Sequence, residues 1–288
     1  MLEKVLKGRP CFCGSGRSYR DCHEAVEKRI RDAGRRGAIV PGRKLLRTRA
    51  QLEGIRASAG INMRVLDAVA AEIQAGMPLS RIDEIVYETT CAAGAVPAPL
   101  HYEGYPYSVC VSVNDQVCHG FPRRETCLKT GDIVNVDCST EYEGFFSDAS
   151  RMFEIGTVDA EAHRLVENAR DCIAAALSVI LPWQPMGVMS AAVQDCAHRA
   201  GFSVVTMYGG HGCGVEFHED PFIDYGWKRT EGMLMVPGMT FTIEPMINQG
   251  TSALRENGWE VYTRDGKLSA QWEVQVLVTE TGAEVLCR

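Results

Sequence analysis

Residues 131–153 read GDIVNVDCSTEYEGFFSDASRMF, and this stretch decides the fold that the rest of the chain must adopt. Its two halves have the apolar, alternating character of strands, and the Glu141–Gly144 region between them predicts a turn. We therefore expect an antiparallel hairpin. Asp137 and Asp148 lie symmetrically about the middle of that turn, which predicts that they are cross-strand neighbours on one face.

These two aspartates need a partner. Like charges placed opposite each other destabilise a sheet, and a carboxylate in an apolar strand is costly unless a cation meets it. One of them staying protonated, or both facing solvent from a polar edge strand, would also resolve the conflict. We favour a metal cation, because Val134, Val136 and Phe146 indicate buried strands.

Further acids and histidines stand in short strand-like or glycine-rich segments. His211 lies in the run GGHGCG, whose glycines would let the backbone approach a ligand closely. Taken singly, a histidine is more often a structural residue, and Glu244 or Glu273 could belong to an exposed edge strand. Together, four carboxylates and one imidazole balance two divalent ions and leave room for a hydroxide, which indicates hydrolytic chemistry. The set is Asp137, Asp148, His211, Glu244 and Glu273.

The order of predicted elements favours an α+β fold. Thr48 and Gln51 fit a capping box that opens a long helix, a second helix ends near Gly94, and strands follow. The order then repeats, with helices over 159–181 and 186–200 before the last strands. Two similar halves around one mixed, curved sheet covered by helices are expected.

Composition excludes several classes of protein. The 288 residues hold 45% apolar residues but no run of about 18 that would span a membrane, and the N-terminus lacks the apolar segment of a secretory signal. Several of the twelve cysteines lie in apolar or glycine-rich segments, where a free thiol behaves as a small hydrophobe. We expect a cytoplasmic protein that does not bind membranes.

Charge divides the chain unevenly. Residues 1–44 carry twelve Lys and Arg against five Asp and Glu, whereas residues 45–288 carry eighteen against thirty-two. A basic head on an acidic body indicates either an acidic partner for the head or a solvated basic linker.

Five motifs carry a specific resemblance, which covers about residues 44–286. The chain resembles the type I methionine aminopeptidases, whose fold is the pseudo-twofold, "pita-bread" α+β fold. The motifs are SVCVSVNDQVCHGFP (108–122), GDIVNVDCSTEYEGFFSDASRMF (131–153), GGHGCGVEFHEDP (209–221), MTFTIEPM (239–246) and LSAQWEVQVLVT (268–279).

The resemblance implies that residues 45–288 form a dinuclear metallo-aminopeptidase domain holding Co, Mn, Fe or Zn. Asp148 and Glu273 would bridge both ions, Asp137 would bind one, and His211 and Glu244 the other. The implied reaction removes the initiator methionine from nascent polypeptides, preferably before a small second residue, through a metal-bridged hydroxide.

The same resemblance assigns roles around the substrate. Glu244 would shuttle the proton, His119 would lie near the scissile amide, and His218 would hydrogen-bond the substrate carbonyl. An ordinary core role is a rival reading for Phe217 and Trp259. Three departures from relatives, Pro99, Ala149 and Val274, bear on selectivity and metal preference. The implied methionine pocket consists of Tyr102, Tyr105, Cys110, Phe217 and Trp259.

The head has a second metal pattern. Cys11, Cys13, Cys22 and His23 provide four soft ligands within thirteen positions, the set that a closed structural zinc site uses. The segment resembles the SEC-C zinc motif, and free thiols in a disordered tail are the alternative. We interpret residues 1–24 as a zinc module and residues 25–44 as a basic helix and linker. Together they would dock a monomeric enzyme on the ribosome or an associated factor.

Three other functions stay open at this point. A catalytically silent ribosome-binding homologue could keep the fold, although the intact ligand set argues against it. A related aminopeptidase acting on X-Pro substrates usually has a larger N-terminal domain than 44 residues supply. A nucleic-acid-binding zinc protein would rest on one short basic module alone.

Overall fold

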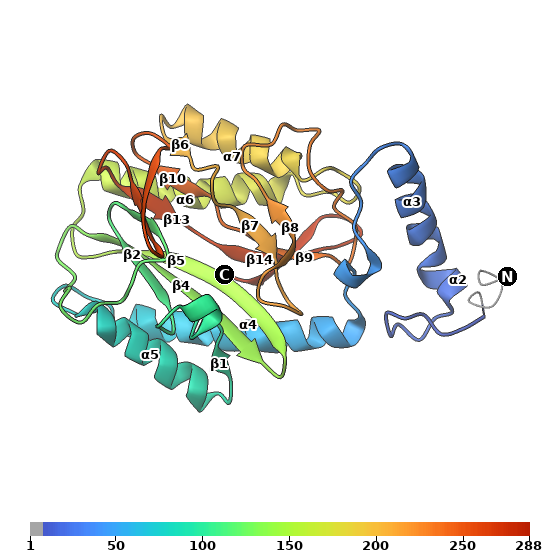
Figure 1. Ribbon diagram of the computed structural model, residues 1–288, viewed down its shortest axis with the longest axis horizontal. Coiled ribbons are helices and arrows are strands. Elements are labelled where there is room, and N and C mark those ends of the chain that lie inside the picture. The colour runs from blue at the N-terminus through green and yellow to red at the C-terminus, as the bar shows by residue number, and fades with distance from the viewer. Residues whose placement is uncertain (1–7) are drawn as a thin grey trace.

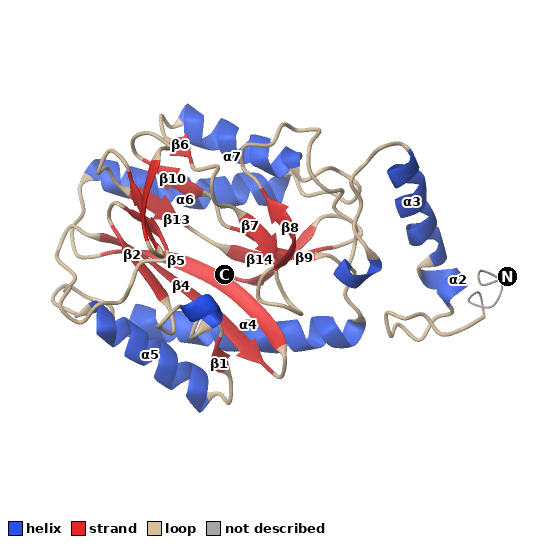
Figure 2. Ribbon diagram, in the orientation of Figure 1, coloured by secondary structure: helices blue, strands red, loops and turns tan. Residues whose placement is uncertain are grey.

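The computed structural model describes residues 8–288. Figure 1 shows the strands in the middle of the main body, with α4 and α5 along one side and α6 and α7 along the other; Figure 2 separates helix from strand by colour. Among the described residues, no helix is both long and apolar enough to cross a membrane.

A long helix opens the first half of the body. The capping box is confirmed: Thr48 Oγ1 accepts from the Gln51 amide at 3.2 Å, and Gln51 Oε1 accepts from the Thr48 amide at 2.8 Å. The elements of this half are α4 (Arg49–Glu72), α5 (Leu79–Ala92), β1 (Val96–Pro97), η2 (Tyr102–Gly104), β2 (Cys110–Val113), β3 (Gln116–Cys118), β4 (Ile133–Tyr142) and β5 (Phe145–Glu154). Helix α4 packs across β4 and β5, and its apolar face is buried there.

The hairpin β4–β5 forms as expected, but its register differs from the prediction. Asp137 lies opposite Ser150, and Asp148 lies opposite Ser139, so the aspartates are diagonal neighbours. The two-residue turn at Glu143 and Gly144, both with positive φ, lies one residue later than predicted. Because the partner shifts by two positions, the two aspartates still share one face.

The second half repeats the order of two helices followed by antiparallel strands. Its elements are α6 (Ala160–Ser178), α7 (Gly187–Arg199), β6 (Ser203–Val204), β7 (Gly210–Gly212), β8 (Glu219–Ile223), β9 (Thr240–Ile243), β10 (Met246–Asn248), β11 (Leu254–Asn257), β12 (Glu260–Thr263), β13 (Ser269–Gln271), β14 (Val274–Val278) and β15 (Ala283–Cys287). Helices α6 and α7 pack on each other and on the strands β6, β10 and β13.

One backbone bridge joins the two halves beside the predicted ligands. The five-stranded sheet has the order β15–β14–β9–β7–β8, and β4 pairs with β5 on one edge and with β1 and β2 on the other. Ser150 of β5 and Glu273, the residue before β14, exchange backbone hydrogen bonds of 3.3 and 3.4 Å. The predicted α+β architecture is therefore present, with carboxylates from both halves meeting at its centre.

The head lies at one end of the molecule and contacts the body. It contains α2 (Tyr19–Cys22) and α3 (Glu24–Arg35), and η1 (Arg43–Leu45) leads into α4. Val26 and Ile30 of α3 pack against the core of the second half, and the Arg29 guanidinium lies 4.0 Å from the ring centroid of Trp183.

Candidate metal centre and substrate cavity

The five predicted ligands converge from five segments. His211 Nε2 on β7 lies 3.7 Å from Asp148 Oδ2 on β5 and 3.5 Å from Glu244 Oε1, just after β9. Asp148, His211 and Glu273 offer ligand atoms that all lie within 4.8 Å of one another. The Asp137 carboxyl on β4 lies beside those of Asp148 and Glu273.

This cluster fits a pair of divalent cations. Asp148, Glu244 and Glu273 are only 4%, 8% and 2% exposed, and buried oxygens of Asp137 (Oδ1) and Glu273 (Oε1) have no hydrogen-bond partner among the described residues. A buried carboxylate oxygen without a donor is costly, and a metal ion satisfies it. Oxygen ligands with one imidazole suit Fe, Mn, Co or Zn.

Burial also shifts the pKa values of these groups toward their neutral forms. Desolvation raises the pKa of Asp137 to about 6 and that of Glu244 to about 8. Burial, followed by neighbouring carboxylates, raises the pKa of Asp148 and Glu273 well above the usual range. Burial lowers the pKa of His211 to about 4, which keeps its imidazole neutral and able to bind metal.

The glycines around His211 have a different purpose from the predicted approach to a ligand. A Cβ at Gly210 would meet the Thr242 carbonyl oxygen at 2.4 Å, and one at Gly212 would meet that of Asp220 at 2.1 Å. The glycines therefore let β7 fit between β8 and β9, and this close strand packing carries His211 into the cluster.

Hydroxyl groups that the sequence analysis overlooked orient the carboxylates. Ser139 Oγ donates to Asp148 Oδ1 at 2.7 Å, and Thr242 Oγ1 donates to Glu244 Oε1 at 2.7 Å. Ser139 shares a strand face with Asp137, and Thr242 shares one with Glu244, because each lies two residues from that predicted ligand. The alternation of side chains along a strand could therefore have identified both hydroxyls. Such outer partners fix ligand orientation.

A cavity of about 630 Å³ opens over the cluster. Every residue of the body predicted to bind metal or substrate lines it, including the five of the expected methionine pocket. The ring of Tyr102 packs edge-on against Phe217, and that of Tyr105 packs edge-on against Trp259, with centroids 4.9 and 5.5 Å apart. The lining residues that sequence analysis did not predict include Tyr208, Glu216, Phe222 and Met246.

The two remaining histidines lie on the cavity wall. His119 has a left-handed backbone (φ 55°), and its ring lies edge-on to Tyr208 and Trp259. The His218 ring centroid is 4.1 Å from that of His211. Desolvation lowers the pKa of both His119 and His218, so both rings are neutral at pH 7.

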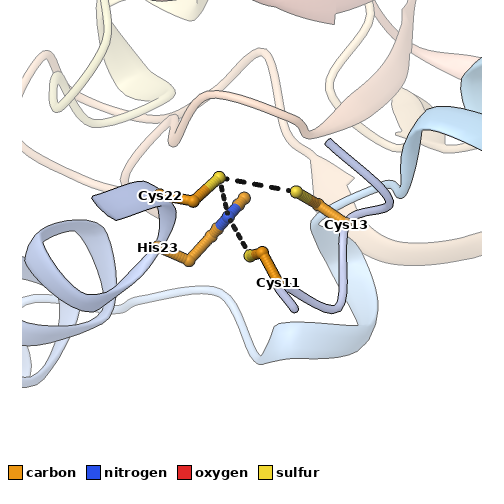
Figure 3. Close-up of side chains that lie close together, drawn as sticks. All are labelled: Cys11, Cys13, Cys22 and His23. Atoms are coloured by element: carbon orange, nitrogen blue, oxygen red, sulfur yellow. Dashed lines mark hydrogen bonds between the residues drawn. The ribbon is translucent and has the colours of Figure 1, made fainter. Parts of the chain in front are cut away.

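The head gathers its own ligand cluster, shown in Figure 3. Cys11 Sγ lies 3.1 Å from His23 Nδ1, and Cys22 Sγ lies 3.5 Å from Cys13 Sγ and 3.2 Å from His23 Nδ1. All four ligand atoms lie within 4.8 Å of one another, the arrangement that a tetrahedral ion would need.

Comparison with known proteins finds a family match for the body and a motif match for the head. Residues 53–280 match the model of metallopeptidase family M24, and residues 10–25 match the SEC-C motif. The chain is 40% identical to methionine aminopeptidase A of Synechocystis sp. over 84% of its length and 96% of that protein. It is 36% identical to the methionine aminopeptidase of Chlamydia muridarum, with 98% of each chain covered.

A solved structure has the same fold. The crystal structure of methionine aminopeptidase from Rickettsia prowazekii matches with a TM-score of 0.82 at 34% identity, over 84% of this chain and 99% of that one. These matches confirm the fold and the family expected from the motifs. The chain belongs to metallopeptidase family M24, among its methionine aminopeptidases.

Proposed function

We propose that this protein is a metal-dependent aminopeptidase that removes the initiator methionine from nascent polypeptides. One observation carries the proposal: three buried carboxylates, a half-buried fourth and an imidazole meet at the wall of a cavity lined by aromatic rings and a thiol. The carboxylates would bind divalent cations, and the apolar lining suits a thioether side chain, which packs well against ring edges.

Asp137, Asp148, His211, Glu244 and Glu273 would hold the ions, with Asp148 and Glu273 shared between them. When bound, two divalent cations make water nucleophilic at neutral pH and stabilise a developing oxyanion. Glu244 would take the proton that the attacking water releases. Ser139 and Thr242 would keep two of the carboxylates oriented through their 2.7 Å hydrogen bonds.

The neutral histidines would handle the substrate. We assign His218 to the carbonyl of the scissile bond, as a hydrogen-bond donor, and His119 to the amide nitrogen that leaves. Neutral rings suit both roles, because each can donate one proton and accept at its other nitrogen. Tyr102, Tyr105, Cys110, Phe217 and Trp259 would surround the methionine side chain.

The head would carry a structural zinc ion on Cys11, Cys13, Cys22 and His23. A module this small cannot bury a core of its own, so metal binding would supply its folding free energy. We assign residues 1–24 to this module, residues 25–44 to the connecting segment and residues 45–288 to the catalytic domain. With its basic flank, the head would dock a monomeric, cytoplasmic enzyme on the ribosome or an associated factor.

The other readings receive less support. The relatives matched over nearly their whole length carry the methionine aminopeptidase name, so cleavage of X-Pro bonds is not favoured. A silent homologue would have no reason to keep unpartnered carboxylate oxygens buried at the wall of a cavity.

A peptide assay tests the proposal. The chain is stripped with a chelator, reloaded separately with Mn, Co, Fe or Zn, and incubated with Met-Ala-Ser and with Ala-Pro-Ser peptides. Metal-dependent release of methionine from the first peptide alone is expected. Cleavage of the X-Pro peptide alone would assign the chain to the other branch, and no cleavage with any ion would favour a silent homologue.

A further inference from the structure

Arg47 is a buried arginine outside the predicted ligand and pocket sets. Its side chain is 1% exposed and pairs with Glu219, whose side chain is 7% exposed. Nε donates to Thr240 Oγ1 at 2.9 Å, Nη1 donates to the Lys44 carbonyl at 3.2 Å, and Nη2 donates to Glu219. The guanidinium thus joins the segment before α4 to β9 and to the start of β8.

These contacts reach both ends of the loop formed by residues 213–219. At the first end, Thr240 Oγ1 donates to the Cys213 carbonyl at 2.7 Å. At the other end, Glu219 Oε1 also accepts from the Val215 amide at 3.2 Å, which closes the loop on itself. Phe217 and His218 project from this loop into the cavity.

The His218 ring depends on this backbone for its position. Among residues 8–288, no hydrogen bond fixes its imidazole, whose ring lies against the rings of Tyr102, His211 and Phe217. A displacement of about 1 Å in a reacting group can cost about 100-fold in rate. The loop backbone therefore decides whether His218 meets the substrate.

A buried ion pair contributes little net stability to a folded protein. Desolvating both charges costs about as much as their attraction returns, so apolar or neutral replacements of both partners are often neutral or stabilising. Removing one partner is destabilising, because it leaves a buried charge without compensation. The pair at Arg47 and Glu219 is better explained by the geometry it imposes on the loop.

We propose that Arg47 and Glu219 are positioning residues that hold the 213–219 loop so that Phe217 and His218 face the metal centre. The inference rests on the proposed aminopeptidase function for its kinetic test and on the loop alone for its structural test. Glu219 lines the cavity and Arg47 does not, but neither is assigned a contact with the substrate. Both act through His218 and Phe217.

The kinetic test separates positioning from stability. The single variant Arg47→Met should lower the melting temperature and reduce kcat/KM for Met-Ala-Ser. The double variant Arg47→Met/Glu219→Gln should regain the melting temperature, yet its kcat/KM should stay about 10- to 100-fold low. The matched control is Arg56→Met/Glu284→Gln, which removes an ion pair whose side chains are both 43% exposed, and its kinetics should stay at the wild-type level.

A thermodynamic cycle with His218→Ala identifies the route of the effect. If the Arg47–Glu219 pair acts through His218, combining its two substitutions with His218→Ala should lower kcat/KM by less than the product of the two separate fold-losses. Fully multiplicative losses would overturn the proposal. So would a double variant that regains activity together with stability.

Hydrogen exchange supplies a readout that needs no catalysis. The Val215 amide should exchange slowly in the wild type and at least tenfold faster in the double variant, while the Arg47→Lys variant, which keeps the charge, should retain part of the protection. If the double variant does not fold, Arg47→Lys replaces it, with intermediate kcat/KM and intermediate Val215 exchange expected. Unchanged Val215 exchange would overturn the inference, whereas a wild type inactive on Met-Ala-Ser would instead overturn the proposed function.

Discussion

The two clusters of candidate metal ligands in this protein are built in opposite ways. In the head, four soft ligands come from thirteen consecutive positions, and the surrounding chain is too short to bury a core. In the body, the candidate ligands come from positions as far apart as Asp137 and Glu273, in two halves that are joined beside them by the backbone bridge between Ser150 and Glu273. In the head, metal would organise the fold, whereas in the body the fold has already gathered the charges. The contrast predicts that the two clusters respond differently to the same perturbation.

The largest effect is expected from Asp148→Asn. It removes a carboxylate proposed to be shared by both ions, so kcat/KM for Met-Ala-Ser should fall by well over 100-fold. Without metal, the same change relieves repulsion among buried carboxylates, so the chelated variant should melt above the chelated wild type. Calorimetry in chelator checks this, with the exposed Glu284→Gln as control. If the chelated variant melts below the chelated wild type, repulsion among these carboxylates does not destabilise the metal-free protein.

A smaller effect is expected from Ser139→Ala, which deletes the 2.7 Å hydrogen bond to Asp148. Loss of an outer partner typically weakens metal binding by about 10- to 100-fold. Titration of Mn into the stripped protein, read as recovered activity, measures this affinity. Ser178→Ala is the control, because Ser178 ends α6 at an exposed site remote from the cavity. Equal affinities for Ser139→Ala and wild type would contradict the role given to this hydroxyl.

The stability of the metal-free protein should fall as pH rises from 6.5 to 8.5. Burial raises the pKa of Glu244 to about 8 and those of Asp148 and Glu273 well above their usual range. A carboxyl whose pKa is raised on folding stabilises the protein at low pH, and that contribution is lost as pH rises through the folded-state value. The histidines with lowered pKa values do not offset this trend, because unfolded histidine is mostly neutral above pH 6.5.

Thermal melts with and without Mn measure the trend. The metal-loaded protein should show little change over this pH range, because its carboxylates are already ionised and neutralised by the ions. The gap between the two melting temperatures should therefore widen by several degrees by pH 8.5. A gap that narrows as pH rises would contradict the electrostatic picture of the centre.

The smallest effect on catalysis is expected from Cys22→Ser in the head. The Mn-loaded variant should lose one equivalent of zinc and the exchange protection of residues 9–23, yet hydrolyse Met-Ala-Ser within about twofold of wild type, because none of the head's candidate ligands lines the cavity. Zinc analysis, hydrogen exchange and the peptide assay measure the three outcomes. The exposed Cys91→Ser is the control. A tenfold loss of kcat/KM would show that the head belongs to the catalytic body.

The sequence could predict those features whose signalling residues lie close together along the chain. The clustering of the head's four candidate ligands could be predicted because all four lie in one short segment. The candidate ligands of the body could be selected because a carboxylate among alternating apolar residues is conspicuous in each strand separately. The face shared by Asp137 and Asp148 was predicted correctly although the register was not, since a shift of two positions preserves the face.

Other features left no signal that one sequence could reveal. The turn at Glu143 and Gly144 fixes the register through two positive φ angles. Glutamate at the first position gives no sequence signal for a positive φ, so the exact position of the turn could not be predicted. Arg47 finds Glu219 and Thr240 across more than 170 positions, and no local pattern connects them. The strand packing behind the glycines at Gly210 and Gly212 likewise depends on neighbours distant in sequence.

The contacts of α3 have a mechanical consequence. Val26 and Ile30 pack on the body, Leu234 donates a backbone hydrogen bond to Ile39 at 2.9 Å, and Arg43 joins Glu27 to the ring of Phe12. The segment that connects the head to the body is thus held in place, so it fixes the orientation of the head as well as its distance from the body. Any partner that grasped the head would also aim the mouth of the cavity in a set direction.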